Sequence, residues 1–134
     1  MVHATQGAEP YRVDIIAAGH ALVADEPPSN GGRGVGAGPF DLVVAGLAAC
    51  TMITLRMYAE RKGWDGFDIA AKLRHRIEGG AHFVDREVEV GGVPDEAGLA
   101  RLRDIVERTP VTLALKPGFT ISTVLTETQP GAAA

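Results

Sequence analysis

Cys50 is the only cysteine in this chain of 134 residues, and its thiol is the most distinctive reactive group in the sequence. A thiolate can attack one oxygen of a peroxide O–O bond, which gives an alcohol and a sulfenic acid, and a second thiol then restores the sulfur. Burial alone makes a thiol inert, so this chemistry needs a cationic group close to the sulfur. The alternative is a packing role, because unpaired cysteine is among the most buried residue types.

Residues 39–62, which surround Cys50, are predicted to form a long buried helix. Pro39 suits the first helical turn, and Lys62 followed by a glycine suits the last one. The helical period places Cys50 on one stripe together with Val43, Leu47, Thr54, Met57 and Arg61. One small sheet cannot cover a helix that is apolar on nearly all sides, so we expect a homodimer.

The composition predicts a soluble protein of one domain, 1–134, with frayed tails at 1–9 and 128–134. A formal net charge of −4 and the lack of a basic run argue against nucleic-acid binding. Asp41 and Arg56 interrupt the longest apolar run, which therefore falls short of the roughly 18 residues that a membrane span needs. The N-terminus lacks the features of a secretion signal, so we expect a cytoplasmic location.

No pattern in the sequence predicts a metal or a cofactor. No histidine combines with Cys50 at a metal-ligand spacing, and His75 on an apolar strand face suits a hydrogen-bonded core histidine better than a ligand or a base. The glycine-rich segment 27–38 matches the dinucleotide-binding fingerprint weakly, but no buried strand precedes it and the lysine of a phosphate-binding loop is missing. We therefore expect a flexible loop there.

Residues 69–90 are predicted to form a hairpin. Apolar and charged residues alternate on both sides of Gly79-Gly80, which suits a two-residue turn. That turn places opposite charges across from each other on the solvent-exposed face, Arg74 with Asp85 and Lys72 with Glu87. Arg86 then falls on the apolar face opposite Leu73, where it needs an anion or a route to solvent.

The remaining segments complete a predicted α+β chain. Residues 11–25 alternate as two short strands joined at Ala18-Gly19. Residues 94–109 predict an amphipathic helix that ends before a proline, and residues 119–125 alternate as a closing strand. This order predicts a mostly antiparallel sheet with a buried central helix and a second, amphipathic helix.

The segment leading into the predicted central helix follows a known motif. Gly36-x-Gly38-Pro39-Phe40-Asp41-Leu42, followed by Ala48-Ala49-Cys50, is similar to the start of the central helix in the OsmC/Ohr family. Residues 19–26 and 55–64 are similar to the OsmC-like subgroup. The resemblance covers residues 11–127. It implies an intertwined homodimer with the cysteine helix buried between subunits, and a thiol peroxidase that reduces organic hydroperoxides or hydrogen peroxide.

The chain departs from the family pattern at positions that complete this chemistry. Family members usually carry a second, resolving cysteine where this chain has Thr109, so an external thiol would have to replace it. The family arginine comes from an N-terminal hairpin turn that here lacks one; Arg33 in the glycine-rich loop and inward-facing Arg86 are the possible substitutes. Asp41 matches the acid of the OsmC-like subgroup. The resemblance therefore implies a catalytic set of Cys50, Asp41 and Arg33.

Three functions stay open at this point. The first is a hydroperoxide reductase with one cysteine, regenerated by an external low-molecular-weight or protein dithiol. The second is a catalytically degenerate dimer whose apolar pocket binds a hydrophobic small molecule. The third is a structural or interaction protein in which Cys50 only packs. Thr109 in place of a thiol favours the second function, whereas the Ala48-Ala49-Cys50 context favours the first.

Overall fold

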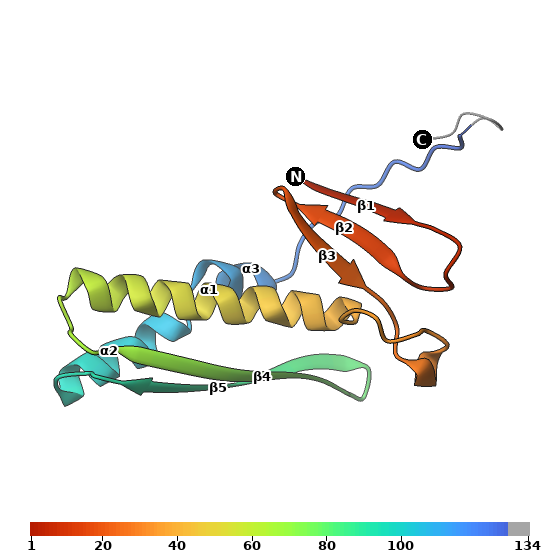
Figure 1. Ribbon diagram of the computed structural model, residues 1–134. Helices are drawn as coiled ribbons and strands as arrows, with labels where there is room; N and C mark the ends of the chain where they lie inside the picture. The colour runs from red at the N-terminus through yellow and green to blue at the C-terminus, as the bar shows by residue number, and fades with distance from the viewer. Residues whose placement is uncertain (129–134) are drawn as a thin grey trace.

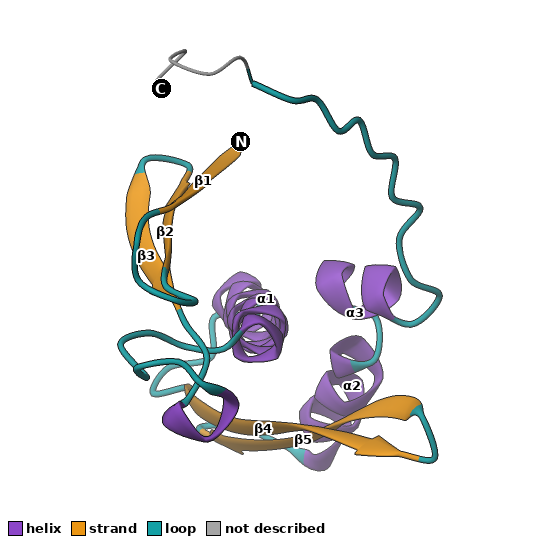
Figure 2. Ribbon diagram, turned by 90° about the vertical axis from the view of Figure 1, so that its right-hand side faces the viewer, coloured by secondary structure: helices purple, strands orange, loops and turns teal. Residues whose placement is uncertain are grey.

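A long central helix lies across a two-stranded hairpin and beside two smaller helices (Figure 1). The computed structural model describes residues 1–128. Its elements are β1 (Val2–Gln6), β2 (Val13–Ala17), β3 (His20–Ala24), the 3₁₀ helix η1 (Pro28–Asn30), α1 (Pro39–Arg61), β4 (Asp68–Glu78), β5 (Ala81–Gly91), α2 (Glu96–Val106) and α3 (Pro110–Leu115). Strands β1–β3 form one antiparallel sheet, and β4 and β5 form another (Figure 2). The expected α+β class is confirmed.

Helix α1 begins and ends close to the predicted residues. Asp41 in its first turn accepts a hydrogen bond from the Gly38 N–H at 3.0 Å, and the helix ends at Arg61. Its buried face consists of Val44, Leu47, Thr51, Leu55 and Ala59. The expected stripe through Val43 and Met57 is therefore only partly buried. Apart from Leu47, the buried residues are shifted along the sequence from those expected, for example Val44 in place of Val43 and Thr51 in place of Cys50.

By length and composition, α1 could cross a membrane. The core helix of a soluble protein meets the same criterion, and α1 supplies Leu55 and Ala59, each 1% exposed, to the main core. Phe67 and Leu102 complete this core, and Trp64, just past the end of α1, packs against it.

The β4–β5 hairpin has the predicted register. Gly79 and Gly80 have φ angles of 57° and 79°, which side-chain-bearing residues rarely adopt and which a two-residue turn of this kind requires. The predicted charge pairs stand opposite each other, Arg74 with Asp85 and Lys72 with Glu87. Arg74 and Asp85 form an ion pair of 3.5 Å on the exposed face.

The two ends of the chain differ from expectation. Residues 2–6, expected within a frayed tail, form strand β1, because β2 offers them an antiparallel edge. Residues 119–125, expected as a closing strand, pair with no strand among residues 1–128; Phe119 is 68% and Leu125 is 90% exposed, and the segment runs away from the body (Figure 2). Residues 129–134 of the other expected tail lie outside the described part of the chain.

The glycine-rich segment is more ordered than expected, because it is wrapped around a buried carboxylate. Asp25 is only 3% exposed, and its side chain accepts backbone N–H groups from Glu26 at 2.8 Å and from Arg33 and Val35 at 3.2 Å. Burial opposes ionisation of Asp25, but the N–H donors of Val35, Glu26, Arg33 and Gly34 together hold its pKa below the ordinary value.

Replacing this carboxylate should loosen the loop. In Asp25→Asn we expect faster amide hydrogen exchange in segment 26–38 at neutral pH, measured by mass spectrometry, whereas the exposed Asp65→Asn should match the unmodified protein. Because the folded pKa of Asp25 is depressed, its contribution to the free energy of unfolding is fully present above the ordinary pKa of 3.8 and is lost as the pH falls through the folded pKa. Unchanged exchange in Asp25→Asn would contradict this assignment.

Candidate active site around Cys50

The thiol of Cys50 lies in the middle of α1, half-buried, where the first turn of α3 meets this helix. The backbone N–H of Val111 donates to its Sγ across 3.5 Å, and the hydroxyl of Thr54 lies 3.9 Å away. Val111 belongs to the first turn of α3, where backbone N–H groups have no partner inside the helix and are free to bond elsewhere. The sulfur is therefore held between two helices that are far apart in the sequence.

A backbone N–H that points at a sulfur favours its anionic forms. The donated hydrogen bond is stronger to a thiolate or a sulfenate than to a neutral thiol, because charge on the acceptor strengthens such bonds. The arrangement thus suits a thiol that must carry negative charge during a reaction.

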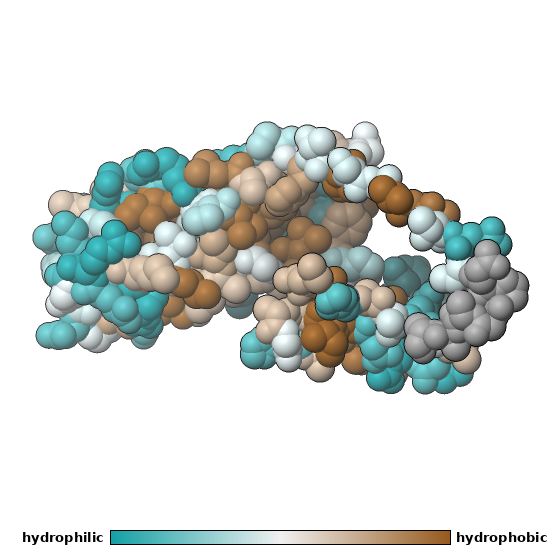
Figure 3. Space-filling model, turned by 90° about the horizontal axis from the view of Figure 1, so that it is seen from above, coloured by the Kyte–Doolittle hydropathy of each residue, from teal (hydrophilic) through white to brown (hydrophobic). Residues whose placement is uncertain are grey.

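Cys50 also lies on a face of α1 that its own chain leaves uncovered. The apolar neighbours on this face are strongly exposed, with Val43 at 47%, Ile53 at 54% and Met57 at 53%. We call these three residues and Cys50 the open stripe. Hydrophobic side chains gather along the middle of the molecule in the view from above (Figure 3). A single chain therefore leaves one side of the thiol without cover.

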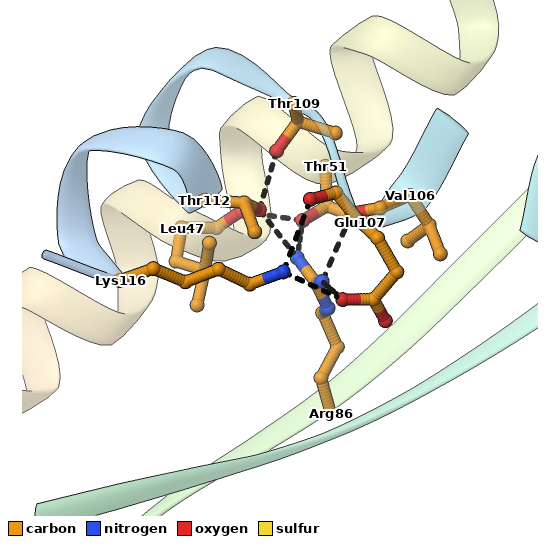
Figure 4. Close-up of polar contacts among 8 residues, drawn as sticks. All are labelled: Leu47, Thr51, Arg86, Val106, Glu107, Thr109, Thr112 and Lys116. Carbon is orange, nitrogen blue, oxygen red and sulfur yellow. Dashed lines mark hydrogen bonds and ion pairs between the residues drawn. The ribbon is translucent and has the colours of Figure 1, made fainter. Parts of the chain in front are cut away.

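Behind the buried face of α1, Arg86 forms a network of hydrogen bonds (Figure 4). Its Nη1 donates to the hydroxyls of Thr51 and Thr112 at 2.9 Å each, and its Nη2 donates to the Val106 carbonyl at 2.9 Å. The Thr112 hydroxyl lies 2.6 Å from that of fully buried Thr109. The expectation that Arg86 needs an anion is met in part: the Glu107 carboxylate forms an ion pair with its Nη2 at 4.0 Å, and the three neutral oxygens are its closer partners.

The other two predicted site residues contact different parts of the chain. Arg33 is 63% exposed and lies 3.7 Å from Glu9. Asp41 accepts the Gly38 N–H at the start of α1. Within residues 1–128 of one chain, neither residue has a hydrogen bond or an ion pair with Cys50.

The histidine on the apolar strand face is hydrogen-bonded. His75 is half-buried, its Nε2 lies 2.9 Å from Nδ1 of His82, and its ring stacks on Phe40 with 4.1 Å between the ring centres. In the part of the chain that the structure describes, no group of three or more His, Cys, Asp or Glu side chains is placed to hold a metal ion.

Sequence reasoning missed the contribution of α3. Pro110 follows the end of the predicted second helix, and it is also the first residue of α3, a position that suits proline. Interpreting Pro110 as the first residue of a helix would have placed the N–H of Val111 in a first helical turn. Nothing in the sequence pattern indicated that Thr51 and Thr112 bind Arg86.

Comparison with known proteins gives one family and several solved structures. The family model described as OsmC-like protein matches residues 31–124. Among curated proteins, none matches at a significant level. A putative osmotic stress induced and detoxification response protein from Psychrobacter arcticus is 17% identical, with 84% of this chain and 85% of that chain covered and a TM-score of 0.68.

Two further structures are described as organic hydroperoxide resistance proteins. The one from Legionella pneumophila is 19% identical, with 87% of this chain and 88% of that chain covered and a TM-score of 0.62. The one from Bacillus subtilis is 18% identical, with 84% and 87% covered and a TM-score of 0.56. At these identities the likeness shows a shared fold.

The proximity of residues 109–111 to Cys50 can be tested with a second thiol. We expect Thr109→Cys to form an intramolecular disulfide with Cys50 under mild oxidation, because its neighbour Val111 already contacts the sulfur. Mass spectrometry of the monomeric chain would detect the disulfide. Ser29→Cys, in the distant helix η1, is the control and should stay reduced. Failure of Thr109→Cys to form the bond, with both thiols still alkylated after unfolding, would contradict the prediction.

Proposed function

Because the chain belongs to the OsmC-like protein family, we propose that it reduces organic hydroperoxides or hydrogen peroxide through Cys50. The observation that carries this proposal is the N–H of Val111 donated to the sulfur, since it favours a charged sulfur at the junction of α1 and α3. The two similar structures described as organic hydroperoxide resistance proteins support the choice of substrate.

The proposed reaction proceeds in two stages. The thiolate of Cys50 attacks one peroxide oxygen, so an S–O bond forms as the O–O bond breaks, and the departing oxygen takes a proton to give an alcohol or water. The sulfur is oxidised by two electrons to a sulfenic acid. Cys50 is the only cysteine, so an external thiol must displace water from the sulfenic acid, and a second external thiol must release Cys50 from the mixed disulfide. A cytoplasmic location would supply such thiols.

We further propose that the active form is an intertwined homodimer. The open stripe exposes apolar surface next to Cys50, and residues 119–125 present an alternating apolar pattern that pairs with no strand among residues 1–128. A second copy could cover both. Arg33 and Asp41, which have no polar contact with Cys50 of their own chain, could then take part in catalysis only at the thiol of the second copy.

A binding function is the second candidate, and one pocket favours it. The pocket has a volume of about 450 Å³ and lies between β5 and α3, with Leu47, Phe83, Val84 and Leu115 as its apolar lining. Arg86, Lys116 and Glu107 add charged groups at its wall. Such a pocket suits a hydrophobic small molecule with a polar end.

The peroxidase proposal predicts a lasting sulfenic acid. One equivalent of cumene hydroperoxide should oxidise Cys50, and the adduct should persist because no internal thiol can condense with it. Dimedone trapping with mass spectrometry would measure the adduct, and turnover should depend on an added dithiol. Cys50→Ser is the control and should abolish both signals. If no sulfenic acid can be trapped under excess hydroperoxide, the binding function takes its place.

The dimer proposal predicts a mass of about 28 kDa in sedimentation at micromolar concentration, twice the 14.0 kDa of one chain. Placing a charge on the open stripe with Ile53→Asp should shift the protein toward monomer, because a carboxylate would be buried there without a partner. Glu60→Asp, a charge-conserving change at an exposed position of α1, should leave the mass unchanged. A folded monomer of the unmodified chain would refute the proposal.

A further inference from the structure

Arg86 is a buried cation whose direct partners are mostly uncharged. Its side chain is only 12% exposed, yet its hydrogen bonds go to two hydroxyls and one carbonyl. The nearest carboxylate, that of Glu107, is 4.0 Å away, is 61% exposed and also pairs with Lys116 at 3.1 Å. Burying a guanidinium with so little neutralisation costs free energy, so its position calls for a role beyond packing.

The partners of Arg86 flank the contacts of Cys50 on both helices. Thr51 follows Cys50 directly in α1, and Thr112 follows Val111, whose N–H points at the sulfur. Nη1 donates to both hydroxyls, so the guanidinium connects α1 to the first turn of α3 (Figure 4). The bond to the Val106 carbonyl also connects Arg86 to the last residue of α2.

The position of helix α3 depends on hydrogen bonds of this kind to the rest of the protein. It has only 6 residues, and no side chain caps its N-terminus. A helix this short is marginal by itself, so its place is set by tertiary contacts. The Thr109–Thr112 bond, the bond from Arg86 and the Val111–Cys50 contact are polar contacts that hold its first turn in place.

We propose that Arg86 is a positioning residue for Cys50. By holding Thr51 and Thr112 together it keeps the Val111 N–H on the sulfur, and it adds a fixed positive charge behind the site, where Arg33 of the same chain does not reach. The inference rests on the proposed function, because it concerns the reactivity of the same thiol. It assigns Arg86 the task of favouring the charged sulfur without touching the peroxide.

The test is the alkylation rate of Cys50 against pH in four variants of the 134-residue chain, Arg86→Met, Arg86→Lys, Thr112→Val and Arg101→Met. Arg86→Met keeps much of the side-chain length and removes the charge and all the hydrogen bonds. Thr112→Val keeps the charge and removes one tie between Arg86 and α3. Arg101→Met is the matched control, because Arg101 is exposed on α2 and pairs with Asp104 on the same helix. Circular dichroism and thermal melting would establish that each variant is folded.

We expect Arg86→Met to react about tenfold more slowly than the unmodified protein at pH 7 and at an equal rate at about pH 10, where a thiol ionises without help. Thr112→Val should be slowed by a smaller factor, Arg101→Met should be unchanged, and Arg86→Lys should recover part of the rate through its charge. A role confined to packing would not produce a difference that vanishes at high pH.

The outcomes separate this inference from the proposed function. If the unmodified protein reacts faster than a free cysteine but folded Arg86→Met has the same pH profile, the inference fails and the peroxidase proposal stands. If Arg86→Met does not fold, Thr112→Val decides, and an unchanged rate in that variant overturns the inference. If Cys50 of the unmodified protein reacts no faster than a free cysteine, both fail together.

Discussion

Helix α1 is apolar around most of its circumference, and one chain covers only part of it. The covered part, through Leu55 and Ala59, forms the core with Phe67 and Leu102. The uncovered part carries Cys50. This constraint links the features of the molecule, because the surface beside the thiol is also the surface that the proposed second copy would bury.

Adjacent residues of a helix point about 100° apart, so the contacts of Arg86 and the thiol of Cys50 lie on different sides of α1. Thr51 faces the interior and accepts a hydrogen bond from Arg86, while Cys50 faces the edge and accepts one from Val111. The short helix α3 takes part in both contacts, since its Val111 N–H binds the sulfur of Cys50 and its Thr112 hydroxyl binds Arg86. The proposed role of Arg86 follows from this arrangement, since the guanidinium binds the residue next to Cys50 and not the sulfur itself.

Local signals in the sequence predicted the elements whose first and last residues, or whose turns, carry a characteristic residue type. Pro39 and Lys62 mark the limits of α1, and Gly79-Gly80 sets the register of β4 and β5. Helix α3 escaped prediction because six residues are too few for a periodic pattern. An alternating pattern at 119–125 predicts a strand that the structure does not form, because the pattern gives no information on whether a partner edge is within reach. The partners of Arg86 come from segments far apart in the sequence, which no local pattern connects.

The contact between Val111 and Cys50 can be observed directly by NMR. The ¹H–¹⁵N resonance of the Val111 amide should move downfield as the pH is raised and the thiol ionises, because a charged acceptor strengthens its hydrogen bond. The same resonance should not follow pH in this way in Cys50→Ser. A Val111 amide that stays unchanged while the Cβ resonance of Cys50 reports ionisation would contradict the view that α3 supports the charged sulfur.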